Sequence, residues 1–233
     1  MLPRKIFVSA VLILMSAASV SWAGDAASFV DLGFSPDGKI YMFAQYGVQS
    51  KTLRPWADLF AVDVPRNNFV SGGKISYVHD NPVLAGQDGS GALYRIISRN
   101  AALADQYGVS FLRQGQPLYI ALDNDPPYPG ESIEFRDFES GNSFRASLVP
   151  FVEGSGENLK SSFYINLEHI SRSGARKTYV VGTPQLKRPL IASYRIKKVM
   201  IAPHDGSIVF VIEMKKQADS GYDIRYMVEA ARL

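Results

Sequence analysis

Three carboxylates follow a proline-rich segment, and their spacing is the first feature that could support catalysis. Glu131, Glu134 and Asp137 lie within seven residues of the chain. Exported glycosidases use two carboxyl groups, one as an acid and the other as a nucleophile or base. On a strand, side chains alternate between faces, so Glu134 and Asp137 would point in opposite directions. We therefore expect a solvated acidic face, and keep a cell-wall or carbohydrate hydrolase as the alternative.

The proline-rich segment itself, residues 123–130, carries three residues that could contact a ligand. Asp123 and Asp125 flank an asparagine whose oxygen, with theirs, could bind Ca²⁺. The later glycine and glutamate of an EF-hand loop are missing, and an Asx-rich turn explains the same residues. Its prolines fix φ and remove hydrogen-bond donors, so the segment cannot be regular structure. We predict ligand contacts at Asp123, Asp125 and Tyr128, and no bound metal.

One aromatic residue stands apart from the others in the first third of the chain. Packing in a core explains most of those aromatic side chains. Trp56 follows the dipeptide Arg54-Pro55, which is typical of a loop. We predict that Trp56 is exposed in this loop and contacts a ligand.

The sequence contains no other recognisable catalytic pattern. His79, His169 and His204 are far apart and lack the H-x-H or H-E-x-x-H spacing of a metal site. There is no G-x-S-x-G elbow, and residues 71–74 (SGGK) match S-x-x-K without the helix that this motif needs. With zero cysteines, thiol nucleophiles, Cys-ligated zinc and disulfides are excluded. No dinucleotide or P-loop motif occurs, so we expect no cofactor and favour a non-catalytic protein.

Residues 1–23 have the three parts of a secretory signal peptide. Two basic residues come first, residues 6–15 are apolar apart from one serine, and small residues lead to Ala23. Signal peptidase accepts small side chains at −3 and −1, so we predict cleavage between Ala23 and Gly24. The apolar core is about half the ~20 residues that a spanning helix needs. We expect a secreted or periplasmic protein with no membrane span after cleavage, and no cysteine is present for lipid attachment.

Cleavage changes the charge of the protein. The whole chain has 25 basic and 22 acidic residues, a formal net charge of +3. Loss of Arg4 and Lys5 leaves 23 against 22, a net charge of +1 on the remaining 210 residues. This near-neutral balance supports neither nucleic acid nor an anionic membrane as a partner.

Alternating apolar residues and frequent turn signals predict a mainly β protein. In residues 39–46 both faces of the strand are apolar, so we expect layers on both sides of it. The predicted strands cover residues 28–34, 39–46, 57–64, 74–78, 117–122, 132–138, 143–152, 161–170, 176–181, 192–201, 206–215 and 222–230.

One segment has helical rather than strand periodicity. Apolar residues recur at helical spacing across residues 91–107, with Ser90 as the expected N-cap and Gly108 as the expected C-terminal glycine. We predict one helix near 91–107 that packs on antiparallel, sandwich-like sheets.

Two hairpin sequences are similar to each other. Residues 30–43 and 199–210 each place a tight Asp-Gly turn between apolar strands, which any two hairpins can share. If the match is meaningful, the two hairpins are neighbours in one sheet. Residues 34–39 (FSPDGK) are also similar to the blade motif of periplasmic propeller proteins, so a small or incomplete β-propeller is the alternative fold.

A longer series of motifs resembles a known family. In order they are DAASF (25–29), GFSPDG (33–38), YMF (41–43), QYGVQ (45–49), PYPG (127–130), EF (134–135), Pro189 and SYRI (193–196). This series resembles the family of predicted secreted bacterial proteins classed as a domain of unknown function. The resemblance implies export and one module over nearly the whole chain, and it implies no activity. Residues after Gln49 depart from the Gly-Ser-Gly-rich segment expected there.

These observations define the expected organisation and function. We predict a single β domain over residues 24–233, with a possible sub-boundary near 123–130. We expect it to bind an envelope protein or a glycan through the loops around Trp56 and residues 123–130, without catalysis.

Overall fold

The computed structural model describes residues 25–122, 132–219 and 221–233, which form three antiparallel sheets and two short helices. The N-terminal sheet has the order β1-β2-β3-β4, with β1 (Ser28–Phe34), β2 (Ile40–Val48), β3 (Pro55–Asp63) and β4 (Asn68–Val78). The central sheet has the order β13-β12-β11-β5, with β5 (Gln116–Ile120), β11 (Ile191–Ile201), β12 (Ile208–Ala218) and β13 (Gly221–Ala231). The outer sheet has the order β10-β8-β7-β6, with β9 also paired to β8; its strands are β6 (Ser132–Arg136), β7 (Ser143–Glu153), β8 (Lys160–Ile170), β9 (Arg176–Val181) and β10 (Arg188–Pro189).

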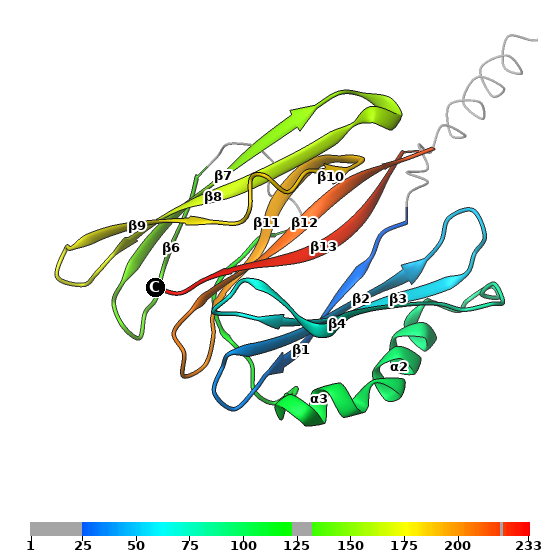
Figure 1. Ribbon diagram of the computed structural model, residues 1–233, viewed down its shortest axis with the longest axis horizontal. Coiled ribbons are helices and arrows are strands. Elements are labelled where there is room, and N and C mark those ends of the chain that lie inside the picture. The colour runs from blue at the N-terminus through cyan, green and yellow to red at the C-terminus, as the bar shows by residue number, and fades with distance from the viewer. Residues whose placement is uncertain (1–24, 123–131, 220) are drawn as a thin grey trace, which may run out of the picture.

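The central sheet lies between the other two, and the helices cover the far face of the N-terminal sheet (Figure 1). Strand β12 shows why this stack forms. Ile208, Phe210 and Ile212 face a core shared with the outer sheet. Val209 and Val211 face a second core, shared with the N-terminal sheet. All five side chains are buried, so neither face of this strand can be left to water.

Strand β2 is buried on both faces in the same way, as its sequence predicts. Tyr41 and Phe43 point into the core shared with the central sheet. Met42 and Ala44 point to the opposite face, where they pack against the helical segment. The alternation of strand side chains therefore builds four layers in series: helices, N-terminal sheet, central sheet and outer sheet.

The helical segment is interrupted, where the sequence predicted one helix over 91–107. Helix α2 (Ser90–Arg99) and helix α3 (Ala101–Tyr107) meet at Asn100. The Asn100 side chain donates a hydrogen bond to the Ile96 carbonyl at 2.7 Å, and its backbone leaves helical geometry with φ −118°. An asparagine that bonds the backbone locally competes with helix continuation, which explains the break.

The two ends of this segment differ in how well the sequence predicted them. Gly108 ends α3 with φ 59°, the left-handed conformation that favours glycine, as expected. The N-cap prediction is wrong, because Gly89 is the cap and Ser90 is already helical. Asp88 takes over part of the capping role, since its Oδ1 accepts hydrogen bonds from the Ser90 backbone at 3.0 Å and hydroxyl at 2.6 Å.

The two similar hairpins are not neighbours in one sheet. Strands β1 and β2 belong to the N-terminal sheet, and β11 and β12 belong to the central sheet. Their turns nevertheless meet across the interface, because a Cβ built on Gly38 would lie 1.7 Å from the Pro203 carbonyl oxygen. Only glycine allows this approach.

The stack confirms the antiparallel, sandwich-like fold. None of the sheets in the described part of the chain is closed, and each hydrophobic core joins only adjacent layers, so no ring of propeller blades forms there. The predicted sub-boundary near 123–130 falls outside the described residues, and the single-domain organisation stays a prediction. Within the described ranges no helix combines the length and hydropathy that a membrane crossing requires.

Burial of the central sheet predicts a large effect of truncation. Replacing Phe210, which is fully buried in β12, by alanine is expected to lower the free energy of unfolding by about 3–5 kcal/mol, because it removes apolar contact and leaves a cavity. Urea unfolding followed by tryptophan fluorescence measures this. The control is Phe138→Ala, at a side chain that is 87% exposed, where we expect less than about 0.5 kcal/mol. Equal effects of the two changes would contradict the arrangement.

Candidate functional site

Trp56 is buried, which corrects the prediction of an exposed loop residue. It is 5% exposed and lies in β3, opposite Gly47 of β2 and Val78 of β4. The loop ends two residues earlier than expected, because Pro55 is the first residue of the strand, a position that tolerates proline. Ligand contact by Trp56 stays a prediction.

Trp56 instead belongs to a group of paired side chains that we call the anchor cluster: Asp25, Trp56, Asp223 and Arg225. The Trp56 indole donates a hydrogen bond to Asp25 Oδ2 at 2.6 Å, and the Arg225 guanidinium pairs with the same oxygen at 2.8 Å. That guanidinium also lies 4.2 Å from the centroid of the indole ring, a cation–π geometry. The Asp25 amide donates to Asp223 Oδ1 at 2.9 Å. The cluster therefore ties the start of the described chain to β3 and β13.

Asp25 is an unusual carboxylate because it is only 5% exposed. Burial raises its pKa; Arg225 and the Trp56 hydrogen bond oppose that rise, and the Asp223 charge adds to it. Within the described part of the chain its Oδ1 has no hydrogen-bond partner, and it lies against Gly47, where a Cβ would be 2.7 Å away. Sequence analysis missed this residue, since its partners lie 31 to 200 residues away along the chain.

A small pocket of about 350 Å³ adjoins the anchor cluster, and we call it the hairpin pocket. It lies between the β2–β3 loop and the tip of the β12–β13 hairpin. An ion pair between Lys51 Nζ and Asp219 Oδ2 bridges these two loops. Its walls are Asp25, Gln49, Ser50, Lys51, Thr52, Leu190, Lys216, Gln217, Ala218, Asp219, Asp223 and Arg225.

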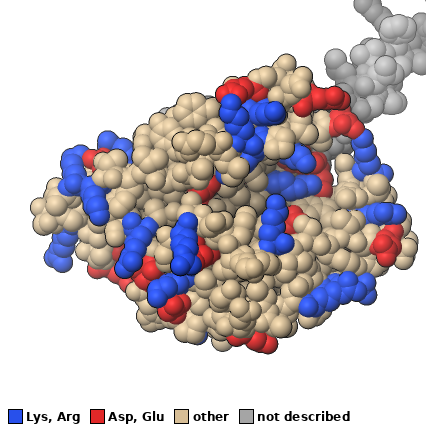
Figure 2. Space-filling view, in the orientation of Figure 1, with Lys and Arg blue, Asp and Glu red and all other residues tan. Residues whose placement is uncertain are grey.

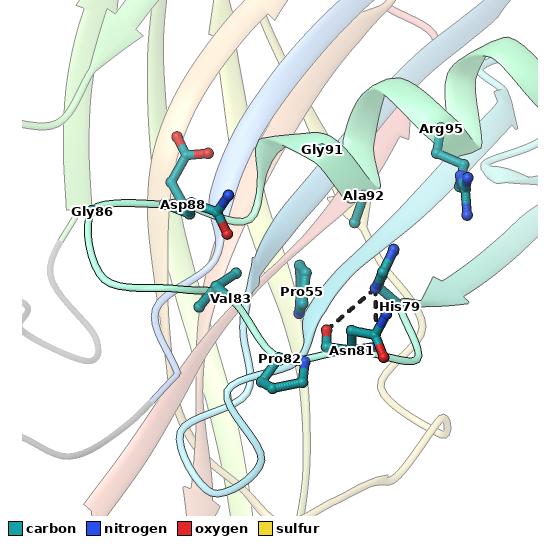
Figure 3. A pocket seen from close by; sticks show the side chains of 11 residues that line it. Pro55, His79, Asn81, Pro82, Val83, Gly86, Asp88, Gly91, Ala92 and Arg95 are labelled. Carbon is teal, nitrogen blue, oxygen red and sulfur yellow. Dashed lines mark hydrogen bonds between the residues drawn. The ribbon is translucent and has the colours of Figure 1, made fainter.

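A larger cavity of about 750 Å³ lies on the opposite side of the β3 start, and we call it the β4–α2 cleft (Figure 3). The loop between β4 and α2 forms most of it, and the first turns of α2 complete it. In Figure 3, Asp88 and Arg95 lie at opposite ends of the cleft with His79 between them. The lining residues are Pro55, His79, Asn81, Pro82, Val83, Gly86, Gln87, Asp88, Gly91, Ala92 and Arg95.

Backbone hydrogen bonds hold the wall of the β4–α2 cleft against the strands. The His79 amide donates to the Pro55 carbonyl and the Val83 amide donates to the Leu53 carbonyl, both at 2.8 Å. His79 Nδ1 lies 3.0 Å from the Asn81 amide nitrogen and 3.2 Å from the Asn81 carbonyl oxygen, so it accepts from the first or donates to the second according to the ring tautomer. Either contact holds the imidazole at the wall of the cleft.

Two glycines fix the approach of α2 to the sheet. A Cβ on Gly89 would lie 2.4 Å from the Gly47 carbonyl oxygen. The N-terminus of α2 can therefore pack on β2 only because residue 89 has no side chain. Gly47 thus contacts the start of α2 through its carbonyl oxygen, and it contacts Asp25 through its Cα atom. This close packing connects the floor of the cleft with the anchor cluster.

The β4–α2 cleft is lined by side chains that can form hydrogen bonds. Arg95 donates to the Tyr77 hydroxyl at 3.0 Å, and hydrogen bonds from the Ser90 hydroxyl and amide hold the pKa of Asp88 below its usual value. The polar side chains that line the cleft are thus hydrogen-bond donors and acceptors, and those of Asp88 and Arg95 are charged. None of the lining residues is a serine, threonine or cysteine. The described part of the chain contains no group of three or more side chains placed to hold a metal ion.

The carboxylates of the hydrolase alternative have structural partners. Glu134 Oε1 accepts two hydrogen bonds from Arg145, at 2.7 and 2.9 Å, in an exposed ion pair on neighbouring strands. Asp137 organises a turn: burial acts to raise its pKa, but hydrogen bonds from Ser140 and from the Glu139 amide outweigh it and lower the pKa. A lowered pKa is the opposite of what a general acid needs, so this turn does not favour Asp137 in that role.

A buried carboxylate that the sequence did not reveal connects all three sheets. Glu229 of β13 pairs with Arg188 of β10 at 3.1 Å and accepts a hydrogen bond from the Asn67 amide group at 2.5 Å. Asn67, in the β3–β4 turn, also accepts a hydrogen bond from the Ala230 amide at 2.7 Å. Burial raises the pKa of Glu229, and the hydrogen bond from Asn67 and the charge of Arg188 offset only part of that rise. We call this group the three-sheet latch.

The remaining predicted site residues cannot be compared with the structure. Asp123, Asp125, Tyr128 and Glu131 lie outside the described residues, and so do Ala23 and Gly24 of the predicted cleavage site. Their proposed roles stay predictions.

The fold and the site define a mainly β protein of three stacked sheets with a polar cleft. The model of a family described as "Predicted secreted protein (DUF2259)" matches residues 42–232, and the chain belongs to that family. This confirms the family resemblance and the prediction of a secreted protein at the level that the family description gives. No curated protein and no solved structure matches the chain.

The latch predicts an unusual dependence of stability on pH. A carboxyl group with a raised pKa in the folded state binds its proton more tightly there than in the unfolded chain, so stability falls as pH rises through the folded pKa. Stability here is the free energy of unfolding. The stability of the unmodified protein relative to that of Glu229→Gln should therefore be greater at pH 5 than at pH 7. Urea titrations at both pH values measure it.

The matched control for this comparison is Glu153→Gln, which removes an exposed carboxylate paired with Lys187. If the difference for Glu229→Gln were the same at pH 7 and pH 5, Glu229 would not titrate as a buried acid.

Proposed function

We propose that this protein is a non-catalytic envelope protein whose β4–α2 cleft binds a glycan. The observation that carries the proposal is a cavity of about 750 Å³ lined by fixed donors and acceptors, His79, Gln87, Asp88 and Arg95 among them. Ligand sites in proteins commonly enclose about 300–1,000 Å³ and use a few fixed polar groups for orientation.

The character of the lining favours a glycan over a protein partner. A sugar presents many hydroxyl groups, and side-chain amides, an imidazole, a carboxylate and a guanidinium can each form hydrogen bonds with them. A protein-binding surface would instead have an aromatic or aliphatic centre. The cleft offers only small apolar residues, Pro55, Pro82, Val83 and Ala92.

The charge distribution agrees with a neutral ligand. On the face drawn in Figure 2, lysines and arginines are interspersed with aspartates and glutamates, without one extended surface of a single sign. A long polyanion would need such a surface. We also propose that the protein has no nucleic-acid partner, because its net charge is near neutral and a nucleic acid is a long polyanion.

Binding to defined glycans tests the proposal. The protein from residue 24 onward is applied to an array of bacterial envelope glycans that includes muropeptides, and affinities for the ligands that bind are measured by calorimetry. Arg95→Ala should weaken binding about tenfold or more, because a hydrogen bond to a charged group contributes about 1.5–3 kcal/mol.

The matched control for Arg95 is Arg99→Ala, one helical turn further along α2. Both guanidinium groups lie over the Tyr77 ring, at 5.9 and 5.4 Å, but Arg99 does not line the cleft. The proposal would be contradicted if both variants lost binding, if neither variant changed the affinity, or if no glycan bound to the protein. Turnover of any glycan by the purified protein would contradict its non-catalytic part.

A further inference from the structure

Tyr77 of β4 gathers three basic side chains beside the β4–α2 cleft. The Arg95 guanidinium donates a hydrogen bond to the Tyr77 hydroxyl at 3.0 Å and lies 5.9 Å from the centroid of the ring. The Arg99 guanidinium lies 5.4 Å from the same centroid. The His79 imidazole packs edge-on against the ring, with the two centroids 6.3 Å apart. We call these four side chains the basic cluster.

No carboxylate in the described ranges neutralises the basic cluster. Every ion pair found there involves other basic residues, and Asp80 and Asp88 of the adjoining loop form none with Arg95 or Arg99. Tyr77 orients the two guanidinium groups but carries no charge. Because Arg95 and Arg99 are four residues apart on α2, they are neighbours on the helix surface and repel each other. An anion bound beside them would therefore be stabilising.

Only part of the basic cluster opens into the cleft. Arg95 and His79 line the cleft, whereas Arg99 and Tyr77 do not. In Figure 3 the Arg95 side chain extends from α2, and the His79 side chain extends from the end of β4, into the space between these elements. Tyr77 accepts from one terminal nitrogen of Arg95, and the other N–H groups of that guanidinium remain available to a ligand. His79 Nδ1 lies against the Asn81 backbone, so Nε2 is the ring nitrogen left for a ligand.

A carboxylate matches these two groups. The planar guanidinium of Arg95 can donate two parallel hydrogen bonds to carboxylate oxygens. The imidazole of His79 can donate from Nε2 to the same group, in the tautomer whose Nδ1 accepts from the Asn81 amide. The lining contains one arginine and one acidic residue, Asp88, so a singly charged group is balanced better than a doubly charged phosphate.

We propose that the glycan bound in the β4–α2 cleft is acidic at one position, and that its carboxylate binds between Arg95 and His79. This rests on the proposed function and adds the chemical class of the ligand to it. The remainder of the glycan is neutral and contacts the side-chain amides of the lining, those of Asn81 and Gln87.

Two acidic disaccharides and their methyl esters test the proposal. One carries its carboxylate on the sugar ring, as in glucuronic acid, and the other carries it on a lactyl ether, as in N-acetylmuramic acid. Calorimetry at pH 7 measures the affinity of the protein from residue 24 onward for all four. At least one acid should bind about tenfold more tightly than its ester, because esterification removes charge-assisted hydrogen bonds. The acid that shows this preference identifies the source of the carboxylate.

Variants of two arginines locate the bound carboxylate. Arg95→Gln should reduce the preference for acid over ester to about twofold or less, and Arg95→Lys should leave an intermediate preference, since it keeps the charge but loses the planar fork. The matched control is Arg99→Gln, on the same face of α2 but outside the lining, where more than about half of the preference should remain. Arg95 is exposed, so its replacement removes no core contact.

Three results would overturn the proposal. Equal affinity for each acid and its ester would exclude a bound carboxylate, and the proposed function would stand with a wholly neutral glycan. A preference that survives Arg95→Gln would place the carboxylate elsewhere. The third result is no binding of any of the four disaccharides; a neutral glycan that still bound on the array would then leave the proposed function standing. The comparison of acid with ester uses only the unmodified protein, so it decides the matter even if a variant does not fold.

Discussion

Burial of the central sheet on both faces is the constraint from which the other features follow. Each of its apolar faces needs a covering layer, so the N-terminal sheet and the outer sheet are both required. Its edge strand β13 is then partly enclosed between those layers: the Glu229 side chain is buried and that of Arg225 is only 20% exposed. Glu229 and Arg225 consequently need partners from other sheets, and the three-sheet latch and the anchor cluster supply them.

The same packing positions the two cavities. Gly89 lets the start of α2 approach the Gly47 carbonyl of β2, and Gly47 lets Asp25 approach, since a side chain on Gly47 would collide with both Asp25 and Trp56. The β4–α2 cleft lies beside the first contact and the hairpin pocket beside the second. The two cavities differ in chemistry: one is rich in neutral hydrogen-bonding groups, and the other in paired charges.

The order and type of nearly all strands could be predicted, because alternation and turn residues act locally. Thirteen strands are present in the described residues, and Arg188–Pro189 is the one the sequence did not indicate, being too short to show a period. The break at Asn100 was missed since apolar spacing continues across it. The candidate site was predicted poorly, because Trp56 was singled out for an exposure that it does not have.

The mainly β class, the absence of thiol chemistry and the membership of a family of predicted secreted proteins could be read from the sequence alone, because each depends on composition or on residues that are neighbours along the chain. Which sheets face one another and where the polar groups meet became visible only in the folded protein. Asp25 and Arg225 are 200 residues apart, and Asn67 and Glu229 are 162 apart. No local pattern reports such pairs, since the burial that makes them necessary exists only after the three sheets have stacked.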